Sequence, residues 1–342
     1  MKRIVVTAML LFTGIFLLSE CRGGTQNAIT VYTALENEQV DRYLRSFKEK
    51  YPAIEVNIVR ASTGVITARL LAEGENSPAD LVWGTAVTSL LVLEEKGMIE
   101  PYAPAGIENI LPEFKDTANP PAWVGLNAWE AAFMVNTVEA AAKNLPEITS
   151  YQDLLRPEFA GHIIMSNPST SGTGFLFVAG LIQLMGQEAA FDYLDRLHTN
   201  IAMYTQSGSA PAVRAGTGEI AVGISYGYAG VAQIRKGFPV KLVFPSEGSG
   251  WDVEGNALIK KAAVKANARL FLDWAISTEA MNDIKDDYAI VSSSTAEVVI
   301  PQGYTRNPIT QLIPNDLRWA AQNRDTILEE WMRRYEGKTE VK

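Results

Sequence analysis

With 342 residues, the chain is longer than one hydrophobic core usually serves, so two domains are expected. Its content of 47% hydrophobic and 20% charged residues is ordinary for a globular protein. The net charge of −9 is spread along the chain without a basic block, which argues against nucleic acid or an anionic membrane surface as the partner.

Residues 1–20 have the organisation of a secretory signal peptide. Lys2 and Arg3 form a charged start, and residues 4–18 form an apolar run that polar residues follow. A membrane span needs about 20 apolar residues. This shorter run therefore indicates a signal that is cleaved rather than a span that stays in the membrane.

The one cysteine of the chain, Cys21, stands where such a signal would be cleaved. A lone cysteine at this place resembles the lipobox of lipoproteins, although Glu20 departs from the usual small residue before it. We therefore expect a lipoprotein signal peptide over residues 1–20, lipidation of Cys21 and a flexible tether over residues 21–28. The alternative is a plain secreted protein with an incidental cysteine. With one cysteine, no intramolecular disulfide is possible.

After the tether, β-branched runs alternate with amphipathic stretches. The expected strands span residues 28–34, 54–61 and 79–85, and the expected helices span residues 37–51, residues 65–73 and a segment ending at Gly97. This alternation predicts a parallel sheet with helices on its faces, in which ligands bind outside the carboxyl ends of the strands. Those ends, at residues 33–36, 62–64 and 83–85, carry hydroxyls, glycines and one tryptophan.

The middle of the chain repeats the pattern. Further strands are expected over residues 162–168, 201–209 and 219–228, and a long extended segment with a polar middle over residues 240–260. The predicted fold class is α/β, with two lobes, each a mainly parallel sheet flanked by helices, and a ligand cleft between them.

Residues 167–186, NPSTSGTGFLFVAGLIQLMG, carry the clearest indication of a binding site. A helix begins with about four backbone N–H groups that lack partners within the helix, and its dipole is positive there. Hydroxyl donors, and two glycines that let a ligand approach the backbone, crowd this start: Ser169, Thr170, Ser171, Gly172, Thr173 and Gly174. They predict an anion site of the phosphate type. A well-capped helix without a ligand is the alternative.

The sequence lacks the usual catalytic constellations. It has two histidines and no zinc-protease motif or cysteine cluster. It also lacks the lysine of a nucleotide-binding P-loop, which argues against nucleotide hydrolysis. We therefore expect neither enzyme activity nor a cofactor.

Seven long stretches carry a family resemblance. They are, in order, VYTALENEQVDRY, VRASTGVITARLLAEGENSPADLVWGTAVTSLLVLEEKGMIEPYAP, PPAWVGLNAWEAAFMVNT, NPSTSGTG, NIAMYTQSGS, VFPSEGSGWDVEGNALIK and NDLRWAAQNRDTILEEW. Together they resemble the 2-aminoethylphosphonate-binding proteins of ABC importers. This group lies within the ferric-ion and sugar-phosphate branch of type II periplasmic binding proteins. The resemblance covers essentially the whole mature chain.

The resemblance implies two lobes that are joined by crossing strands and close on a ligand like a hinge. It places the crossings near residues 133–136 and 253–258. Residues 29–134 and 255–342 would form lobe 1, and residues 135–254 would form lobe 2. The implied partners are the permease and ATPase subunits of an ABC importer. The protein would act as a monomer without nucleic acid, lipid-anchored on the extracytoplasmic face.

Aminoethylphosphonate carries a phosphonate at one end and an ammonium at the other, so the resemblance implies two environments. The phosphonate is expected at the loop 169–174 and at hydroxyls of the facing lobe, whereas the ammonium needs a carboxylate or an aromatic face. The implied phosphonate side comprises Thr33, Ala34, Ser62, Thr63, Ser169, Thr170, Ser171, Gly172 and Thr173. The implied ammonium side and its walls comprise Trp83, Tyr226, Glu247, Trp251, Asp252 and Glu254.

Three alternatives remain at this point. A ferric-ion-binding protein would use tyrosines, and Tyr226 and Tyr228 would share one face if the strand over residues 219–228 continued through both. No adjacent tyrosine pair is present, and no metal site is expected otherwise. A sugar-phosphate-binding protein would grip its phosphate in the same way. A surface lipoprotein that adheres to host molecules is the third alternative, which no repeat or exposed apolar stretch favours.

Overall fold

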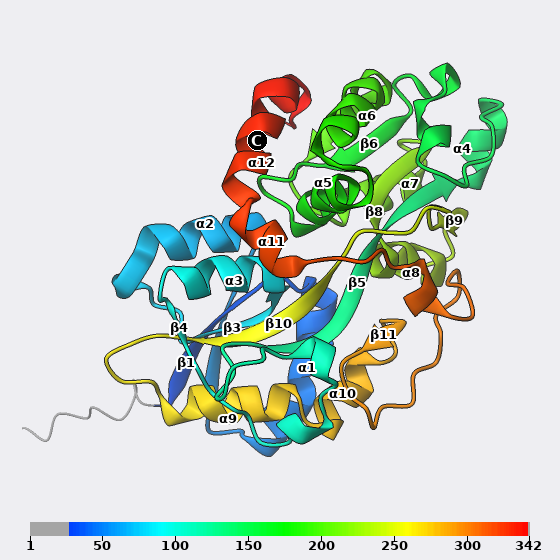
Figure 1. Cartoon of the computed structure of the whole chain (residues 1–342). Helices are drawn as coiled ribbons and strands as arrows, with labels where there is room; N and C mark the ends of the chain where they lie inside the picture. The colour runs from blue at the N-terminus through cyan, green and yellow to red at the C-terminus, as the bar shows by residue number, and fades with distance from the viewer. Residues whose placement is uncertain (1–26, 341–342) are drawn as a thin grey trace, which may run out of the picture.

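The computed structural model describes residues 27–340, which form two lobes, one above the other in Figure 1. The expected signal peptide, Cys21 and most of the tether lie outside the described residues. The α/β fold and the two-lobed arrangement are confirmed.

Lobe 1 alternates strands and helices as the sequence pattern predicts. Its elements are β1 (Ala28–Thr33), α1 (Asn37–Lys50), β2 (Glu55–Arg60), α2 (Thr63–Glu73), β3 (Leu81–Ala86), α3 (Val87–Glu95), β4 (Ile99–Glu100), α9 (Ala266–Ala275), α10 (Thr278–Ile284), β11 (Ile290–Val291) and α11 (Leu317–Gln322). In α1, Val40, Tyr43, Leu44 and Phe47 recur at helical spacing and are buried, so one stripe of the helix packs on the sheet.

Lobe 2 is built in the same way. Its elements are α4 (Thr137–Ala142), β6 (Ile163–Ser166), α5 (Gly172–Met185), α6 (Gln187–Asn200), β7 (Ile201–Thr205), α7 (Ala210–Thr217), β8 (Val222–Tyr226), α8 (Gly227–Arg235), β9 (Val240–Val243) and α12 (Arg324–Tyr335). The charge-free helix predicted after residue 171 is α5. Every residue of α5 up to Ile182 is buried, which explains why the helix is apolar on all sides.

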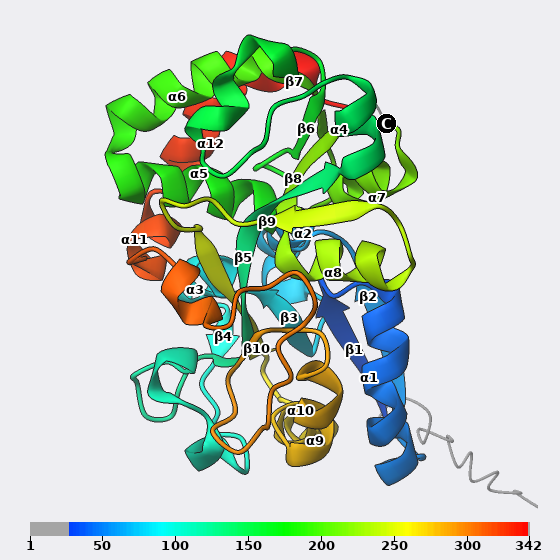
Figure 2. The ribbon, with the colours of Figure 1, turned by 90° about the vertical axis from the view of Figure 1, so that its right-hand side faces the viewer.

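Two long strands, β5 (Val124–Asn136) and β10 (Trp251–Ile259), join the lobes (Figure 2). β5 pairs with β10 and β11 up to Glu130 and with β8 and β9 from Ala131 onward. The second crossing lies just before β10, where Gly250 accepts a backbone hydrogen bond from Ala131 at 2.9 Å. Both crossings therefore come a few residues earlier than expected. β5 is buried almost throughout, so its sequence does not mark the point where it changes lobes.

The resulting mixed sheet has the order β2-β1-β3-β10-β5-β8-β6-β7, with β4, β9 and β11 pairing beside it. Its outer strands pair in parallel, whereas β10 and β5 in the middle are antiparallel to their neighbours. The parallel ends direct the carboxyl ends of their strands toward the junction between the lobes, where a ligand can bind.

The C-terminal segment corrects the expected division into lobes. α11 packs on α3 of lobe 1, but α12 lies beside α5 and α6 of lobe 2 (Figures 1 and 2). The Tyr335 hydroxyl donates to Asp195 at 2.7 Å, and Lys338 donates to the carbonyl oxygens of His198 and Ile201 at 2.6 Å. The chain thus crosses between the lobes a third time, and residues after α11 belong to lobe 2.

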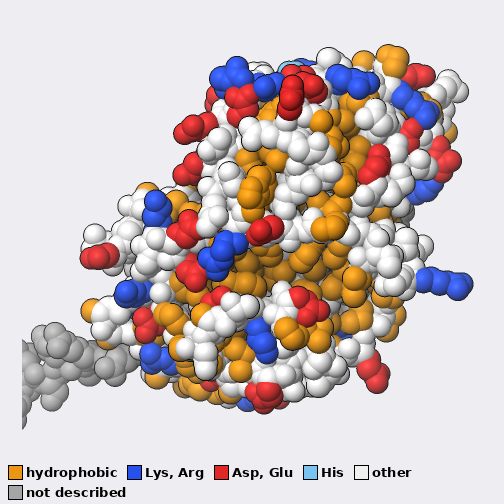
Figure 3. All heavy atoms as spheres, viewed as in Figure 1, with side chains coloured by type: hydrophobic (Ala, Val, Ile, Leu, Met, Phe, Trp, Pro, Cys, Tyr) orange, Lys and Arg blue, Asp and Glu red, His pale blue; other side chains and the backbone are white. Residues whose placement is uncertain are grey.

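The surface carries mixed charges. On the face seen in Figure 3, acidic and basic side chains are interspersed, and hydrophobic side chains show between the lobes. Over residues 27–340, no helix has the length and apolar character needed to cross a membrane.

Candidate functional site: a cavity between the lobes

A small cavity lies between the lobes at the ends of the strands, with about 40 Å³ of free space. Lobe 1 and the crossing strands contribute Ala34, Glu36, Arg60, Ser62, Thr63, Gly84, Ala86, Trp129 and Glu254. Lobe 2 contributes Ser171, Gly172, Thr173, Gly208 and Tyr226. The cavity therefore has contributions from both lobes and depends on their relative position.

The lobe 2 wall is the amino end of α5. Ser171 is the N-cap, and its hydroxyl accepts a hydrogen bond from the Gly174 amide at 3.3 Å. Gly208, in the loop after β7, approaches so closely that a Cβ atom there would lie 2.2 Å from the Thr173 hydroxyl oxygen. The loop can therefore enclose the two hydroxyls only because residue 208 is glycine.

The amino end of α2, in lobe 1, faces the amino end of α5. Ser62 precedes α2 and makes no capping hydrogen bond, so its hydroxyl is free to meet a ligand. A Cβ atom on Gly172 would lie 2.9 Å from the Thr63 hydroxyl oxygen, which shows how closely the two helix ends meet. Two positive helix ends with hydroxyl donors on both sides form an environment that suits an anion.

Glu36 forms part of the opposite wall. It accepts a hydrogen bond from Arg60 at 2.6 Å and one from the Tyr226 hydroxyl at 3.3 Å. Since Tyr226 belongs to lobe 2, the second bond spans the cleft. The Tyr226 ring meets the Trp129 ring edge to face, with centroids 5.5 Å apart.

Glu254, on β10, completes this wall. Its side chain is buried, and its Oε1 accepts a hydrogen bond from the Tyr288 hydroxyl at 3.1 Å. Burial raises the pKa of Glu254 to about 8, because few groups around it compensate a negative charge. The cavity thus combines hydroxyl and helix-end donors with carboxylates and aromatic rings.

A family model described as bacterial extracellular solute-binding protein matches residues 76–309. The chain belongs to this family. It is an extracytoplasmic solute-binding protein of the ABC-importer class, which binds a small ligand and is not an enzyme.

Two of the proteins to which this solute-binding protein is similar have a ligand in their names, and the two ligands differ. An uncharacterized protein of Haemophilus influenzae is 30% identical over 90% of this chain and 92% of its own length. The Fe(3+)-binding periplasmic protein of Serratia marcescens is 22% identical over 84% and 82%. Among solved structures, periplasmic binding protein AfuA from Actinobacillus pleuropneumoniae, with exogenous fructose-6-phosphate bound, is 28% identical with a TM-score of 0.84. The match covers 90% of this chain and 98% of the AfuA chain. The periplasmic binding protein P5PA is 26% identical with a TM-score of 0.82, covering 90% and 99%.

The two lobes of the solute-binding protein are closed on each other. The Gly64 amide donates to the Thr170 carbonyl oxygen across the cleft at 3.0 Å. Further contacts between the lobes are the Arg235–Asp287 pair at 2.8 Å, the Lys236–Glu38 pair at 3.1 Å and the stacked rings of Tyr228 and Tyr288 at 5.4 Å. Because the lobes meet on both sides of the cavity, a ligand there is enclosed rather than held on a surface.

Several residues expected on the phosphonate side lie next to the cavity rather than on its wall. Ala34, Ser62, Thr63 and the residues 171–173 do line it. Thr33 is fully buried, and its hydroxyl accepts a hydrogen bond from the Leu35 amide at 3.1 Å. The Thr170 hydroxyl donates to the Gln206 carbonyl oxygen at 2.8 Å, and Ser169 is likewise absent from the lining. Loop residues before the helix thus shape the site but do not face it.

Most residues expected on the ammonium side lie elsewhere. Trp83 is buried in the core of lobe 1, where its ring packs on Phe271 at 5.4 Å. Glu247 accepts a hydrogen bond from the Tyr151 amide at 3.1 Å in a lobe 2 loop.

Two further residues expected on the ammonium side, both on β10, form hydrogen bonds away from the cavity. The Trp251 indole donates to the Ile313 carbonyl oxygen at 2.9 Å, which secures the third crossing. Asp252 accepts from the Thr88 hydroxyl at 2.6 Å at the start of α3, and burial raises its pKa to about 6. Of the expected carboxylates, Glu254 alone lines the cavity.

The tyrosines do not form the pair that a shared strand face would give. β8 ends at Tyr226 and α8 begins at Gly227, so Tyr228 is on a helix. Tyr226 lines the cavity, whereas Tyr228 does not; the Tyr228 ring lies 6.3 Å from the Tyr226 ring and stacks on Tyr288. Among the described residues, no group of three or more histidine, cysteine, aspartate or glutamate side chains could hold a metal ion.

Several residues of the wall were not anticipated from the sequence. Glu36 and Gly84 fall within the expected strand ends but were not singled out as site residues. The others either fall outside those ends or stand in no motif that indicates a site: Arg60, Ala86, Trp129 and Gly208. Residues 127–131, NAWEA, did not indicate a site in the sequence. In a strand buried on both faces, residues that face a cavity and residues that face the core are of the same apolar types.

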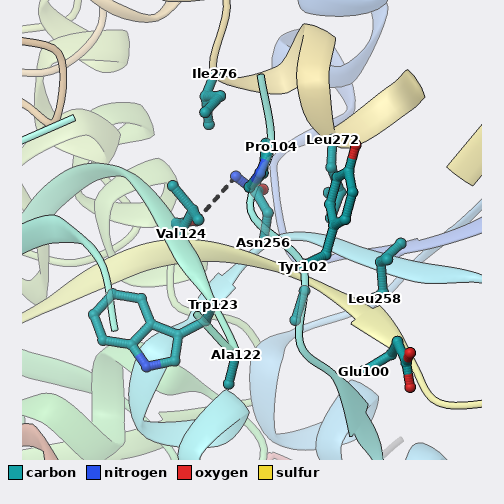
Figure 4. Close-up of a pocket in the computed structure, with 11 residues that line it drawn as sticks. Glu100, Tyr102, Pro104, Ala122, Trp123, Val124, Asn256, Leu258, Leu272 and Ile276 are labelled. Atoms are coloured by element: carbon teal, nitrogen blue, oxygen red, sulfur yellow. Dashed lines mark hydrogen bonds between the residues drawn. The ribbon is translucent and has the colours of Figure 1, made fainter. Parts of the chain in front are cut away.

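A second cavity, within lobe 1, is shown in Figure 4. It holds about 10 Å³ and is lined mostly by apolar side chains, with Asn256 donating to the Val124 carbonyl oxygen at 3.1 Å. This volume is at the lower limit for one water molecule, so the cavity is a packing defect rather than a ligand site.

Proposed function

We propose that the solute imported through this protein is a small organophosphonate, with 2-aminoethylphosphonate as the specific ligand. The observation that carries the proposal is the meeting of the α2 and α5 amino ends, with Ser62, Thr63, Ser171 and Thr173 on the wall of the cavity between the lobes. Helix amino ends with hydroxyl donors suit the three oxygens of a phosphonate. The carboxylates of Glu36 and Glu254 line the same cavity and suit an ammonium group.

Two other ligands compete with this proposal. A sugar phosphate is supported by the likeness to AfuA, which was solved with fructose-6-phosphate. Ferric ion is supported by the Serratia relative, but the cavity presents a single tyrosine, Tyr226.

Calorimetric titration with 2-aminoethylphosphonate and with ferric citrate tests the proposal. We expect one phosphonate per chain to bind, and Tyr226→Phe to weaken it by at most about tenfold, because a neutral hydrogen bond contributes about 0.5–1.5 kcal/mol. Tyr228→Phe is the matched control, since Tyr228 lies outside the cavity. A coloured, iron-loaded protein that loses iron on Tyr226→Phe and gives no heat with the phosphonate would contradict the proposal.

We also propose that Cys21 is lipidated and holds the protein on the outer side of a membrane. The apolar run before Cys21 supports this attachment. A diacylglyceryl group supplies the two chains that stable anchoring requires. Cys21→Ser is therefore expected to move the protein from the membrane fraction to the soluble fraction. An unchanged distribution in cell fractionation would rule the anchor out.

A further inference from the structure

One buried acceptor in the cavity lacks a partner. Glu254 is 8% exposed, and its Oε2 has no hydrogen-bond partner of normal geometry among residues 27–340. A buried carboxylate oxygen without a donor costs free energy, so natural proteins leave one mainly where a ligand or a proton completes it. Since Glu254 lines the cavity, a bound ligand can supply the missing donor.

A neighbouring donor is also unused. The Trp129 indole N–H is buried without an acceptor, although Trp129 lines the same cavity. The cavity thus offers an acceptor on Glu254 and a donor and aromatic face on Trp129, together with the helix starts and hydroxyls of Ser62, Ser171 and Thr173. A ligand that satisfies both sets of groups has an anionic group and, a short distance away, a group rich in N–H donors.

We propose that Glu254 selects the cationic end of the ligand, its free Oε2 accepting an N–H bond from a primary ammonium that also contacts the Trp129 ring. This inference rests on the proposed function, because it assumes an anionic group at the α5 end. It goes further by assigning amine recognition to one residue. The protein is therefore expected to prefer aminoalkyl phosphonates to phosphonates and sugar phosphates that lack an amine.

The electrostatic surroundings give the selection a pH dependence. Burial raises the pKa of Glu254 to about 8, and Glu36 and Asp287 raise it further. The hydrogen bond from Tyr288 and the neighbouring Asn127 side chain on β5 lower this pKa, but by less than burial raises it. The other ionisable groups around it are Tyr43, Tyr226 and, through Glu36, Arg60. Without ligand, Glu254 is therefore mostly protonated at neutral pH.

An ammonium beside Glu254 favours the charged carboxylate and lowers its pKa. Binding of the cationic ligand therefore releases a proton. Affinity for that ligand is expected to rise as pH increases toward about 8, the pKa of the free protein, and to level off above it. A ligand without an amine leaves Glu254 protonated and releases no proton from it.

The test compares 2-aminoethylphosphonate with ethylphosphonate, which lacks only the amine, on wild-type protein and on Glu254→Gln. Calorimetry at pH 6, 7 and 8, in buffers of different ionisation enthalpy, gives both affinity and proton release. We expect wild type to prefer the amine-bearing ligand by about tenfold to a hundredfold, the range of a hydrogen bond to a charged group. Glu254→Gln should lose this preference and the amine-dependent proton release while retaining ethylphosphonate. Glu247→Gln, a carboxylate outside the cavity, is the control and should match wild type.

The outcomes separate the two proposals. Equal affinity of wild type for both phosphonates, or a preference that survives in Glu254→Gln, would overturn the role of Glu254 and leave the phosphonate proposal standing. Proton uptake on binding the amine-bearing ligand would also overturn it. Binding of neither phosphonate would overturn the proposed function and this inference together. The preference for 2-aminoethylphosphonate over ethylphosphonate is measured on wild-type protein alone, so the inference stays testable if the variant folds poorly.

Discussion

Gly64→Ala is expected to weaken ligand binding by about 5- to 150-fold without unfolding the protein. A Cβ atom at residue 64 would lie 2.3 Å from the Ser169 carbonyl oxygen and 2.8 Å from the Thr170 carbonyl carbon, both on the opposite lobe. These are backbone atoms, so a flexible side chain cannot move aside, and the lobes must separate instead. An overpacked contact of this kind costs about 1–3 kcal/mol, which corresponds to the stated loss.

The same change leaves the ligand-free fold intact, because Gly64 lies in the first turn of α2 with a helical backbone that alanine also adopts. The melting temperature of the ligand-free protein should therefore stay the same or rise slightly, while calorimetry shows the loss of affinity. Gly337→Ala is the control, since nothing lies within 4 Å of a Cβ atom there. Wild-type affinity in Gly64→Ala would mean that the closed arrangement of the lobes is not the binding state.

Replacing both Ser171 and Thr173 with alanine is expected to reduce phosphonate affinity by at least about a hundredfold. Both hydroxyls line the cavity at the start of α5, and each can donate to a charged phosphonate oxygen. A hydrogen bond to a charged group contributes about 1.5–3 kcal/mol, and every 1.4 kcal/mol is about tenfold in affinity. Phosphorus NMR or calorimetry with 2-aminoethylphosphonate measures the loss.

Ser171 also caps α5, so the double variant should lose about 1 kcal/mol of stability through the missing cap. Binding is therefore measured well below its melting temperature. Thr199→Ala with Thr217→Ala is the matched control, because both hydroxyls are bonded to carbonyls of their own helices away from the cavity. A loss of less than about threefold in the Ser171 and Thr173 variant would show that the anion binds elsewhere.

The sequence alone predicted the features that depend on local chemistry. The alternation of β-branched and amphipathic segments predicted the α/β lobes, because each element buries its own periodic face. The hydroxyl-rich start of α5 was recognisable because helix capping and exposed amides are properties of consecutive residues. Ser171, Gly172 and Thr173 therefore fell on the cavity wall as expected.

The tertiary structure decided which of several equivalent residues line the cavity. Trp83 and Trp129 both lie in buried strands, yet the first packs in a core and the second lines the cavity. Asp252 and Glu254 stand two apart on β10, but α3 covers Asp252 through Thr88 and leaves Glu254 open to the cavity.

The partner of each strand face, and the lobe on which α12 packs, depend on contacts between segments far apart in the sequence. Local periodicity shows that a residue is buried, but the surface against which it is buried is set only when the lobes close. That physical difference is why the hydroxyl-rich start of α5 was visible in the sequence, whereas the wall formed by Glu36, Trp129 and Glu254 emerged only from the structure.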